Sequence, residues 1–557
     1  MSEALALDAW LHAAIGVANA VGRLHDQGLV HRDIQPANLS IGETVELTGL
    51  DSATSTLAYM APERTGRMNR SIDSRADLYS VGVVLYELAT GVLPFHANDP
   101  MEWMHCHIAR QPAPPSILPP VLSQIVMKLL AKTADDRYQT AAGLEADLRA
   151  YADGGTELEL GRHDVSSRFT VPERLYGRER DVERLLAAFR RVVERGEREV
   201  VLVAGYSGIG KSSVIRELHK MLVGLFASGK HDQQKIGIPY APFAQAFRGL
   251  ITHVPKSSLV DALAVNGALI VSLIPELEAI VGVLPPVQDV PPADAQRRFH
   301  DVFRRFIGVF ATPEHPLVLV LDDLQWFDEA SLALLEHLAT DPHLRHLLLI
   351  GAYRDNEVAA DHPLRALHAE RLELAPLSHG DLARLVSDAL RTSVVHAMPV
   401  ADLVHAKTAG NPFFAIQLLK TFVDRELVRF EAGAWHWDLE AIRGHGLTDN
   451  VAELVTTRLE ALPPQLRHGL RSLACLGHSL RAETLALLPD LPPIQPYIDA
   501  GVLVRSSDGF AFAHDRILEA AYAMIPDDER AAEHARIGWR LASSDNIFDV
   551  VHHLNSG

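Results

Sequence analysis

The strongest chemical signal in the sequence is a glycine-rich stretch between the apolar run 200–203 and a segment with helical periodicity. It extends over residues 205–212 as GYSGIGKS, which has the spacing G-x-x-x-x-G-K-S. Glycines at this spacing let successive backbone N–H groups face phosphate oxygens, and the following helix N-terminus adds its dipole. A chance glycine-rich turn is the alternative, but the order strand, loop, helix favours a site for ATP and Mg²⁺. The predicted nucleotide contacts are Gly205, Gly208, Gly210, Lys211, Ser212 and Ser213.

Within this site each side chain has an expected role. Lys211 is expected to contact the β- and γ-phosphates, and the Ser212 hydroxyl to ligate Mg²⁺. More than a hundred residues later, an apolar run ends in Asp322-Asp323. We expect Asp322 to hold Mg²⁺ through water and Asp323 to orient or activate the attacking water. Two aspartates that only close a buried strand and cap the next segment are the alternative.

The elements around these residues predict how they are positioned. Strands and helices alternate over residues 176–395, which favours a parallel, doubly wound sheet with the nucleotide beyond the carboxyl ends of its strands. A further buried strand, HLLLIGAY, ends just before Arg354. An arginine in this place either contacts the γ-phosphate or forms a surface ion pair, and the sequence leaves both possibilities open.

A second set of candidate residues lies in the first 150 residues. His31-Arg32-Asp33 is followed by Asn38, with the spacing H-R-D-x-x-x-x-N. Ala-Pro-Glu at 61–63, Asp77 and Arg137 follow in order, and the set resembles the C-terminal lobe of a Ser/Thr protein kinase. The resemblance implies a mainly α-helical fold in which Glu63 pairs with Arg137 and Asp77 braces the catalytic loop. In an active kinase, Asp33 would accept the hydroxyl proton and Asn38 would bind a metal ion.

Several parts that an active kinase needs are not found in this sequence. No glycine-rich loop, lysine strand or ATP-covering lobe precedes residue 31, and Gln35 stands where such kinases usually have lysine. Gly49 occupies the position of the metal-binding aspartate. If the register shifts by two residues, Asp51 occupies that position instead. Phosphoryl transfer depends on lysine and metal ions for charge neutralisation, so their loss predicts a vestigial, pseudokinase-like docking lobe. The alternative is an active kinase whose missing lobe is encoded upstream of Met1.

The remaining segments are expected to join and cover the ATPase core. Residues 151–175 form a predicted linker, after which Gly177-Arg178-Glu179 resembles a segment near the adenine in AAA-like ATPases. Residues 396–435 are expected to form a helical lid, and residues 436–557 a winged helix and the start of a helical region.

The lid and the winged helix each carry one further candidate. The stretch GNPFF resembles the G-x-P element of STAND-class ATPases, which implies that Pro412 packs on the adenine. His514 matches a histidine that touches ADP phosphates in the closed state of several such proteins. An ordinary helix start at Pro412 and a surface histidine at position 514 are the alternatives.

Composition restricts the class of protein. The net charge of −19 argues against a polyanion-binding surface, so we expect no nucleic-acid partner. The two cysteines, Cys106 and Cys475, lie in different predicted domains, which predicts free thiols in a reducing compartment. No apolar run approaches the roughly 20 residues that span a bilayer, and we expect a cytoplasmic protein.

The order of these segments resembles the N-terminal third of large bacterial hybrid signalling proteins. There, a Ser/Thr kinase-like domain and a STAND- or AAA-type ATPase precede helical repeats, sensor domains and a histidine kinase of a two-component system. The resemblance implies a fragment or truncated homologue acting as an ATP-dependent switch, with signalling domains as its partners. An active Ser/Thr kinase and an ATP-binding scaffold without turnover are the other two hypotheses.

Overall fold

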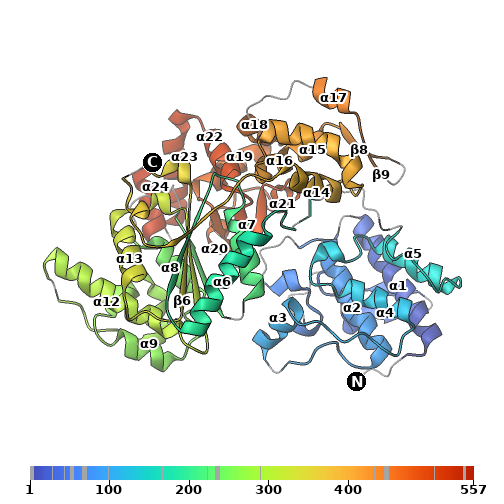
Figure 1. Ribbon diagram of the computed structural model, residues 1–557, viewed down its shortest axis with the longest axis horizontal. Coiled ribbons are helices and arrows are strands. Elements are labelled where there is room, and N and C mark those ends of the chain that lie inside the picture. The colour runs from blue at the N-terminus through green and yellow to red at the C-terminus, as the bar shows by residue number, and fades with distance from the viewer. Residues whose placement is uncertain are drawn as a thin grey trace.

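The computed structural model of the protein comprises several domains (Figure 1). Beside the nucleotide-binding core lies a separate N-terminal lobe, and two further helical parts follow the core along the chain. The residues that the structure describes are 5–27, 29–42, 44–49, 56–65, 72–97, 99–162, 164, 169, 171–172, 174–222, 224–231, 239–288, 290–359, 361–431, 434–444, 451–506, 509–542 and 547–556.

The N-terminal lobe is mainly helical. Its central helix carries the sequence DLYSVGVVLYEL and is buried on nearly all sides, as expected for a helix without a polar face. Trp10 lies fully buried against it and donates its indole N–H to the carbonyl of Leu85 at 2.8 Å. The elements of this lobe are α1 (Leu7–Asp26), β1 (Leu39–Ile41), β2 (Val45–Leu47), α2 (Ser74–Thr90), α3 (Pro100–Ile108), α4 (Pro120–Leu129) and α5 (Ala141–Ala152).

A five-stranded parallel sheet forms the centre of the nucleotide-binding core, as the sequence predicts. Its strand order is β4-β5-β6-β3-β7. Because all five strands are parallel, their carboxyl ends meet at one edge, where Lys230 of β4 lies opposite Asp322 of β5. The strands are β3 (Glu199–Ala204), β4 (Leu225–Lys230), β5 (Leu317–Asp322), β6 (Leu347–Tyr353) and β7 (Glu370–Glu373).

Helices cover both faces of this sheet. Alternate side chains of β3 and β5 face opposite sides, so that Val203 packs with helices α6 and α7 while Leu202 packs with α8 and α12. Phenylalanines dominate the second face, including Phe243, Phe303 and Phe306, which are fully buried. The covering helices are α6 (Glu179–Arg195), α7 (Lys211–Met221), α8 (Ala241–Arg248), α9 (Lys256–Leu263), α10 (Ala268–Leu273), α11 (Glu278–Val281), α12 (Pro292–Phe310) and α13 (Glu329–Thr340).

A small helical part, here called the lid, follows the sheet. Its apolar core includes Phe422 and Trp435, and Phe169 and Val171 from the predicted linker pack against it. The lid comprises α14 (His379–Ala389), α15 (Val394–Thr408), α16 (Pro412–Asp424), β8 (Val428–Glu431), β9 (Ala434–Trp437) and α17 (Leu439–Gly444).

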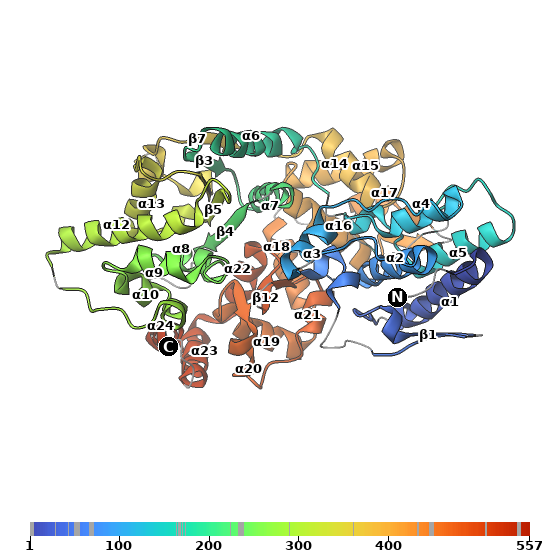
Figure 2. The same cartoon turned by 90° about the horizontal axis from the view of Figure 1, so that it is seen from below.

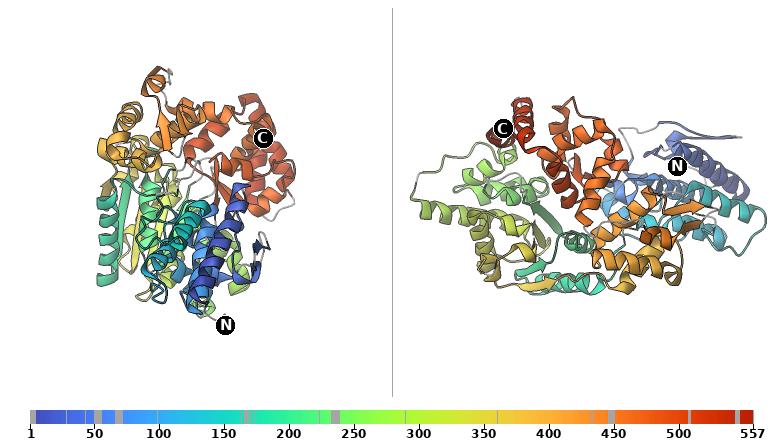
Figure 3. Two further views of the ribbon diagram at one scale, coloured as in Figure 1. Left: turned by 90° about the vertical axis from the view of Figure 1, so that its right-hand side faces the viewer. Right: turned by 90° about the horizontal axis from the view of Figure 1, so that it is seen from above.

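The C-terminal segment combines helices with a three-stranded antiparallel sheet of order β10-β12-β11. In Figure 2 its helix α22 lies beside β4 and α8 of the core, and the left view of Figure 3 shows this segment on the side of the molecule away from α6. Its elements are α18 (Val451–Glu460), α19 (Pro464–Cys475), β10 (Ser479–Arg481), α20 (Ala482–Ala486), α21 (Gln495–Asp499), β11 (Leu503–Ser506), β12 (Gly509–Phe512), α22 (Asp515–Ala523), α23 (Asp527–Leu541) and α24 (Ile547–Ser556).

Two features outside the nucleotide-binding core bear on earlier expectations. Both cysteines are free, as predicted, and both are buried. Among the helices that the structure describes, none has the length and apolar character needed to cross a bilayer.

The N-terminal lobe contacts the lid through Asp164. The carboxylate of Asp164 accepts hydrogen bonds from the backbone N–H groups of Gln139 and Thr140, and its carbonyl accepts one from Arg391 at 3.0 Å.

Candidate nucleotide site

The glycine-rich loop joins β3 to α7 in a conformation that requires its glycines. Gly208 and Gly210 have φ values of 79° and 103°, a region that residues with a side chain rarely adopt. A Cβ atom on Gly208 would also lie 2.8 Å from the Cβ of Phe413 in the lid. Lys211 begins α7 and is buried, and its ammonium donates to the carbonyls of Gly205 at 2.7 Å and Tyr206 at 3.2 Å. Gly205 directly follows the last residue of β3, so the loop surrounds the lysine ammonium.

The predicted metal-binding groups lie together at the carboxyl edge of the sheet. The Ser212 hydroxyl donates to Asp322 Oδ2 at 3.1 Å, although the two residues are 110 positions apart. Ser213 follows in the same first turn of α7. Hydroxyl and carboxylate oxygens are the donors that Mg²⁺ prefers, and it usually takes few protein ligands beside phosphate and water. The residues present therefore fit a magnesium ion bound together with a nucleotide.

Asp323 occupies a strained and buried position next to this pair. Its φ of 59° is unusual for a residue with a side chain, and its side chain is only 4% exposed. Gln325 donates to Asp323 Oδ1 at 2.9 Å, which fixes the direction of the carboxylate. Burial, together with the neighbouring charge of Asp322, raises the pKa of Asp323 to about 6. A carboxylate with such a pKa can accept a proton near neutral pH.

Arg354 is buried, so it does not form the surface ion pair that was one of its two predicted roles. Its guanidinium stacks over Trp326 at 4.5 Å from the ring centre and lies 3.7 Å from Asp323 Oδ1. It also pairs with Glu357 at 2.9 Å and with Glu519 of α22 at 3.2 Å. Arg354 therefore connects the sheet edge with the C-terminal segment.

The C-terminal segment reaches the site through the first residues of α22. Asp515 forms ion pairs with Lys230 and with Arg354 and accepts a contact from His478 at 3.1 Å. The Lys230 ammonium is the main charge that holds the pKa of Asp515 well below its usual range, despite its burial. His514 caps α22, and its ring stacks on Phe413 with ring centres 3.8 Å apart. Burial lowers the pKa of His514 to about 3, so this ring is neutral at physiological pH.

The lid forms direct contacts with the glycine-rich loop. Asn411 donates to the carbonyl of Ser207 at 3.0 Å, and its side chain also caps α16. Pro412 is the first residue of this helix, which agrees with the alternative that it is an ordinary helix start. The helix begins directly beside the glycine-rich loop. On the other side, Arg178 donates to the carbonyls of Ile209 at 2.9 Å and Ala375 at 2.7 Å.

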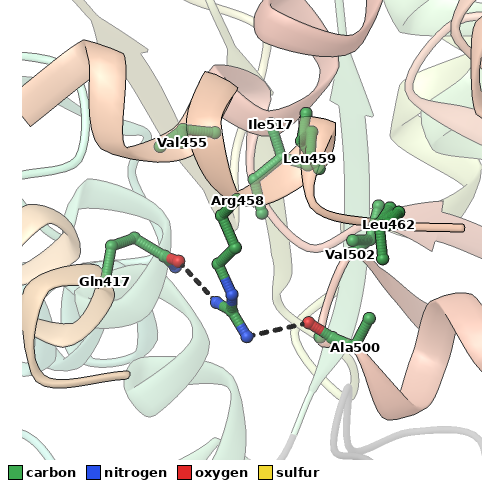
Figure 4. A pocket seen from close by; sticks show the side chains of 9 residues that line it. Gln417, Val455, Arg458, Leu459, Leu462, Ala500, Val502 and Ile517 are labelled. Carbon is green, nitrogen blue, oxygen red and sulfur yellow. Dashed lines mark hydrogen bonds between the residues drawn. The ribbon is translucent and has the colours of Figure 1, made fainter. Parts of the chain in front are cut away.

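A small cavity lies between the lid and the C-terminal segment (Figure 4). Its volume is only about 30 Å³, it is lined mainly by aliphatic side chains, and Arg458 of α18 lies along it. This guanidinium donates to Gln417 Oε1 of the lid at 2.9 Å and to the carbonyl of Ala500 at 3.1 Å. Arg458 therefore joins the lid to the C-terminal segment.

The kinase-like residues lie in a separate place, within the N-terminal lobe. The Asp33 carboxylate accepts bonds from the Gln35 amide at 3.1 and 3.2 Å and from Asn38 at 2.8 Å. Gly49 lies beside Asn38, where its missing Cβ would be 2.9 Å from Asn38 Oδ1. No carboxylate is therefore supplied at this position, and Asp51 lies outside the residues that the structure describes.

Two predicted braces of this lobe are confirmed. Arg137 and Glu63 are buried and form two hydrogen bonds, at 2.7 and 2.9 Å. Asp77 accepts bonds from the backbone N–H groups of His31 at 2.7 Å and Arg32 at 2.8 Å.

Sequence reasoning missed Lys230, whose ammonium lies 3.4 Å from Asp323 Oδ2. Its strand, LFASGK, carries serine, glycine and lysine and does not resemble a buried strand. The apolar start of that strand, placed between α7 and the Asp322 strand in chain order, was the one signal that could have revealed it.

A phosphate-binding loop between a strand and a helix, at the carboxyl edge of a parallel sheet, is the arrangement of a P-loop NTPase. The family model of the AAA ATPase domain matches residues 174–350, which contain this site. The family model of the protein kinase domain matches residues 4–147. The chain therefore carries both of the domain types that its motifs predict.

Curated relatives agree with this combination. The chain is 30% identical to hybrid signal transduction histidine kinase G of Dictyostelium discoideum, over an alignment covering 80% of this chain and 16% of that protein. Residues of the N-terminal lobe are 37% identical to serine/threonine-protein kinase PknB of Mycolicibacterium smegmatis and 38% identical to PknB of Mycobacterium tuberculosis, each alignment covering 22% of this chain and 23% of the kinase. The chain thus spans less than a quarter of each of these relatives. Its similarity to a hybrid signalling protein is confirmed.

Proposed function

We propose that this chain is an ATP-binding signal-transduction module of the STAND type, in which slow ATP hydrolysis switches the arrangement of the lid and the C-terminal segment. The observation that carries the proposal is the convergence of Lys211, Ser212, Asp322 and Asp323 at one edge of the sheet. These residues come from two distant segments and include each group that phosphate binding and water activation require.

The proposed reaction is attack of water on the γ-phosphorus of ATP, which gives ADP and inorganic phosphate. The glycine-rich loop and Lys211 would bind the phosphates, and Ser212 and Asp322 would hold Mg²⁺, which neutralises phosphate charge when bound. Asp323 would orient the water and accept its proton. Arg354 would stabilise charge that develops on the γ-phosphate oxygens.

The switch would use the contacts that the lid and the C-terminal segment make with the loop. Pro412 would pack on the adenine, and His514 would contact the phosphates of bound ADP in the docked arrangement. The support for this part is the position of both residues, because Phe413 touches Gly208 in the loop and stacks on His514. We propose that the C-terminal segment is a winged helix and that it would move away from the glycine-rich loop when ATP is bound.

We assign the N-terminal lobe a docking role in the same signalling module. Its Asp33 and Asn38 would be vestigial, because Gln35 and Gly49 supply neither the lysine nor the second carboxylate that phosphoryl transfer uses. The partners would be sensor domains and a histidine-kinase domain, the second of which the name of the Dictyostelium relative includes.

Replacing Asp323 by asparagine tests the assignment of the water-activating residue. Loss of a general base typically slows a reaction by roughly 10²- to 10⁴-fold, so phosphate release at saturating ATP should fall by at least about 100-fold. ATP affinity should change little, because Asp323 would not bind the phosphates. Asp361→Asn, an exposed aspartate of the same domain, is the control and should behave as wild type. Turnover that survives Asp323→Asn would exclude this role, whereas a wild type that binds ATP without turnover would support a scaffold.

The runner-up function, a Ser/Thr protein kinase, is favoured by the intact braces at Glu63–Arg137 and Asp77. Replacing Asp33 by alanine separates the two functions. We expect ATP binding and phosphate release to remain within about twofold of wild type, because Asp33 lies in another domain. The measurement is transfer of radiolabelled γ-phosphate to protein alongside release of inorganic phosphate. Protein phosphorylation that disappears with Asp33→Ala would favour the kinase instead.

A further inference from the structure

Every carbonyl of the glycine-rich loop from Gly205 to Ile209 accepts a hydrogen bond. The first two are bonded to the ammonium of Lys211. The other three are held by groups that lie outside the loop, two in the lid and one directly before α6. These contacts run from the Asn411 side chain to the Ser207 carbonyl at 3.0 Å, from the Phe413 N–H to the Gly208 carbonyl at 3.3 Å, and from the Arg178 guanidinium to the Ile209 carbonyl at 2.9 Å.

These bonds determine which way the N–H groups of the loop point. In a planar trans peptide the C=O and N–H bonds point in opposite directions. Because the Ser207 carbonyl faces the lid, the N–H of Gly208 points away from the lid. The N–H of Gly210 points away from Arg178 for the same reason. Within the part of the chain that the structure describes, neither N–H donates a hydrogen bond, so both are available to phosphate oxygens.

The opposite orientation of these peptides would oppose the binding of an anion. A peptide turned over would present its carbonyl, which carries a partial negative charge, where a phosphate needs an N–H group. Glycine makes this turn easy because it adopts positive and negative φ values about equally readily. Gly208 and Gly210, with φ values of 79° and 103°, are such residues. The loop therefore depends on bonds from its surroundings to keep its N–H groups on one side.

Asn411 provides one of these bonds from the lid. It is buried, and the two ends of its amide have separate partners. Its Oδ1 accepts from the N–H of Phe414 at 3.3 Å and caps α16, whereas its Nδ2 donates to the Ser207 carbonyl. Gly208 permits this close approach, because a Cβ atom there would lie 3.0 Å from Asn411 Oδ1. One side chain therefore fixes both the start of the lid helix and the loop.

Arg178 provides the second bond from the opposite direction. It is buried directly before α6, and its guanidinium also donates to the carbonyl of Ala375 at 2.7 Å. Ala375 follows β7, so this bond connects the support of the loop to the end of the central sheet. Asp181 lies 3.5 Å from the guanidinium and balances its charge. The Ile209 carbonyl is thus held by a side chain that is itself fixed at three points.

We propose that Asn411 and Arg178 are positioning residues for the phosphates of ATP, which hold loop carbonyls outward and so keep the intervening N–H groups on the phosphate side. Neither side chain needs to touch the nucleotide. The inference rests on the proposed ATPase function and adds a second action of the lid, because the helix that begins at Pro412 also shapes the loop. Lid closure and phosphate affinity are then linked, so that each favours the other.

The first test is the affinity of the full chain for ATP with Mg²⁺, measured by calorimetry for wild type and Asn411→Ser. Serine is also a good N-cap residue, so α16 keeps its cap, whereas the neutral hydroxyl lacks the amide that donates to the loop. Loss of this bond should raise Kd about 5- to 10-fold. The matched control is Ser393→Ala, which removes the cap of α15 in the same lid and should leave Kd within about twofold of wild type.

The second test uses Arg178 and hydrogen exchange. Arg178→Met should raise Kd for ATP by at least about tenfold, and Arg178→Lys should recover part of the loss because an ammonium can still donate to one carbonyl. At saturating ATP, the loop amides of Asn411→Ser should exchange faster than those of wild type, while the amides of α16 should exchange at the wild-type rate. Loss of a merely structural contact would loosen α16 as well.

The outcomes separate the inference from the proposed function. A wild type that does not bind ATP would overturn both. A wild type that binds ATP, with Kd unchanged in either Asn411→Ser or Arg178→Met, would overturn the inference alone. Equal losses of affinity in Asn411→Ser and Ser393→Ala, or faster exchange in α16 as well as in the loop, would show that these side chains only stabilise the lid and would also overturn it.

Discussion

Replacing Lys211 by alanine is expected to remove most of the affinity of this chain for ATP. Its ammonium is buried and bonded to the loop carbonyls of Gly205 and Tyr206, so it lies within the loop that would surround the phosphates. Charge-assisted hydrogen bonds contribute about 1.5 to 3 kcal/mol each, and we expect Kd to rise by roughly 100-fold or more. Titration of the full chain with ATP and Mg²⁺ in a calorimeter measures this change.

The matched control for this variant is Lys220→Ala. Lys220 belongs to the last turn of the same helix and pairs with Glu217, so its removal tests the helix without touching the loop. Its Kd should stay within about twofold of wild type, because a partly exposed ion pair contributes little. Equal loss of affinity in both variants would show that helix stability and not phosphate contact explains the result.

The second large effect is expected from Glu63→Ala in the N-terminal lobe. Its carboxylate is 2% exposed and forms both hydrogen bonds to the Arg137 guanidinium, which is completely buried. Removing one partner of a buried ion pair leaves an uncompensated charge and typically costs about 3 to 5 kcal/mol. Urea unfolding, followed by tryptophan fluorescence to which the buried Trp10 of this lobe contributes, should show this loss in the free energy of unfolding.

The control for that loss is Glu440→Ala, which removes an exposed partner of Arg443 in the lid. It should change stability by less than about 1 kcal/mol. A Glu63→Ala protein as stable as wild type would mean that the brace does not carry the fold of this lobe. Nucleotide affinity should be retained in Glu63→Ala at low urea, because the P-loop lies in another domain.

The glycine-rich loop of the nucleotide site could be predicted from the sequence because its functional residues are contiguous. The loop from Gly205 to Ser212 is one continuous stretch, and its spacing alone specifies a strand, a turn and a helix N-terminus. Asp322 was found in the same way, because an apolar run that ends in carboxylates indicates the end of a buried strand. In the N-terminal lobe, the order of the motifs was sufficient to pair Glu63 with Arg137.

The contacts between distant segments could not be predicted in this way. Lys230 comes from a polar edge strand, and its significance depends on the strand order, which places β4 next to β5. The bond from Asn411 to Ser207 joins residues 204 positions apart, and nothing near either residue signals it. Asp515 follows the predicted His514 directly, but its ion pairs with Lys230 and Arg354 require the docked position of the whole C-terminal segment. Sequence periodicity specifies elements, whereas these contacts depend on how the elements pack.

The central claim is that phosphate chemistry in this chain belongs to the P-loop site and not to the kinase-like lobe. The most direct measurement is release of phosphate from γ-labelled ATP by wild type, Lys211→Ala and Asp33→Ala under the same conditions. We predict slow release that is lost in Lys211→Ala and unchanged in Asp33→Ala. Phosphate release or protein labelling that survives Lys211→Ala and disappears in Asp33→Ala would contradict the account.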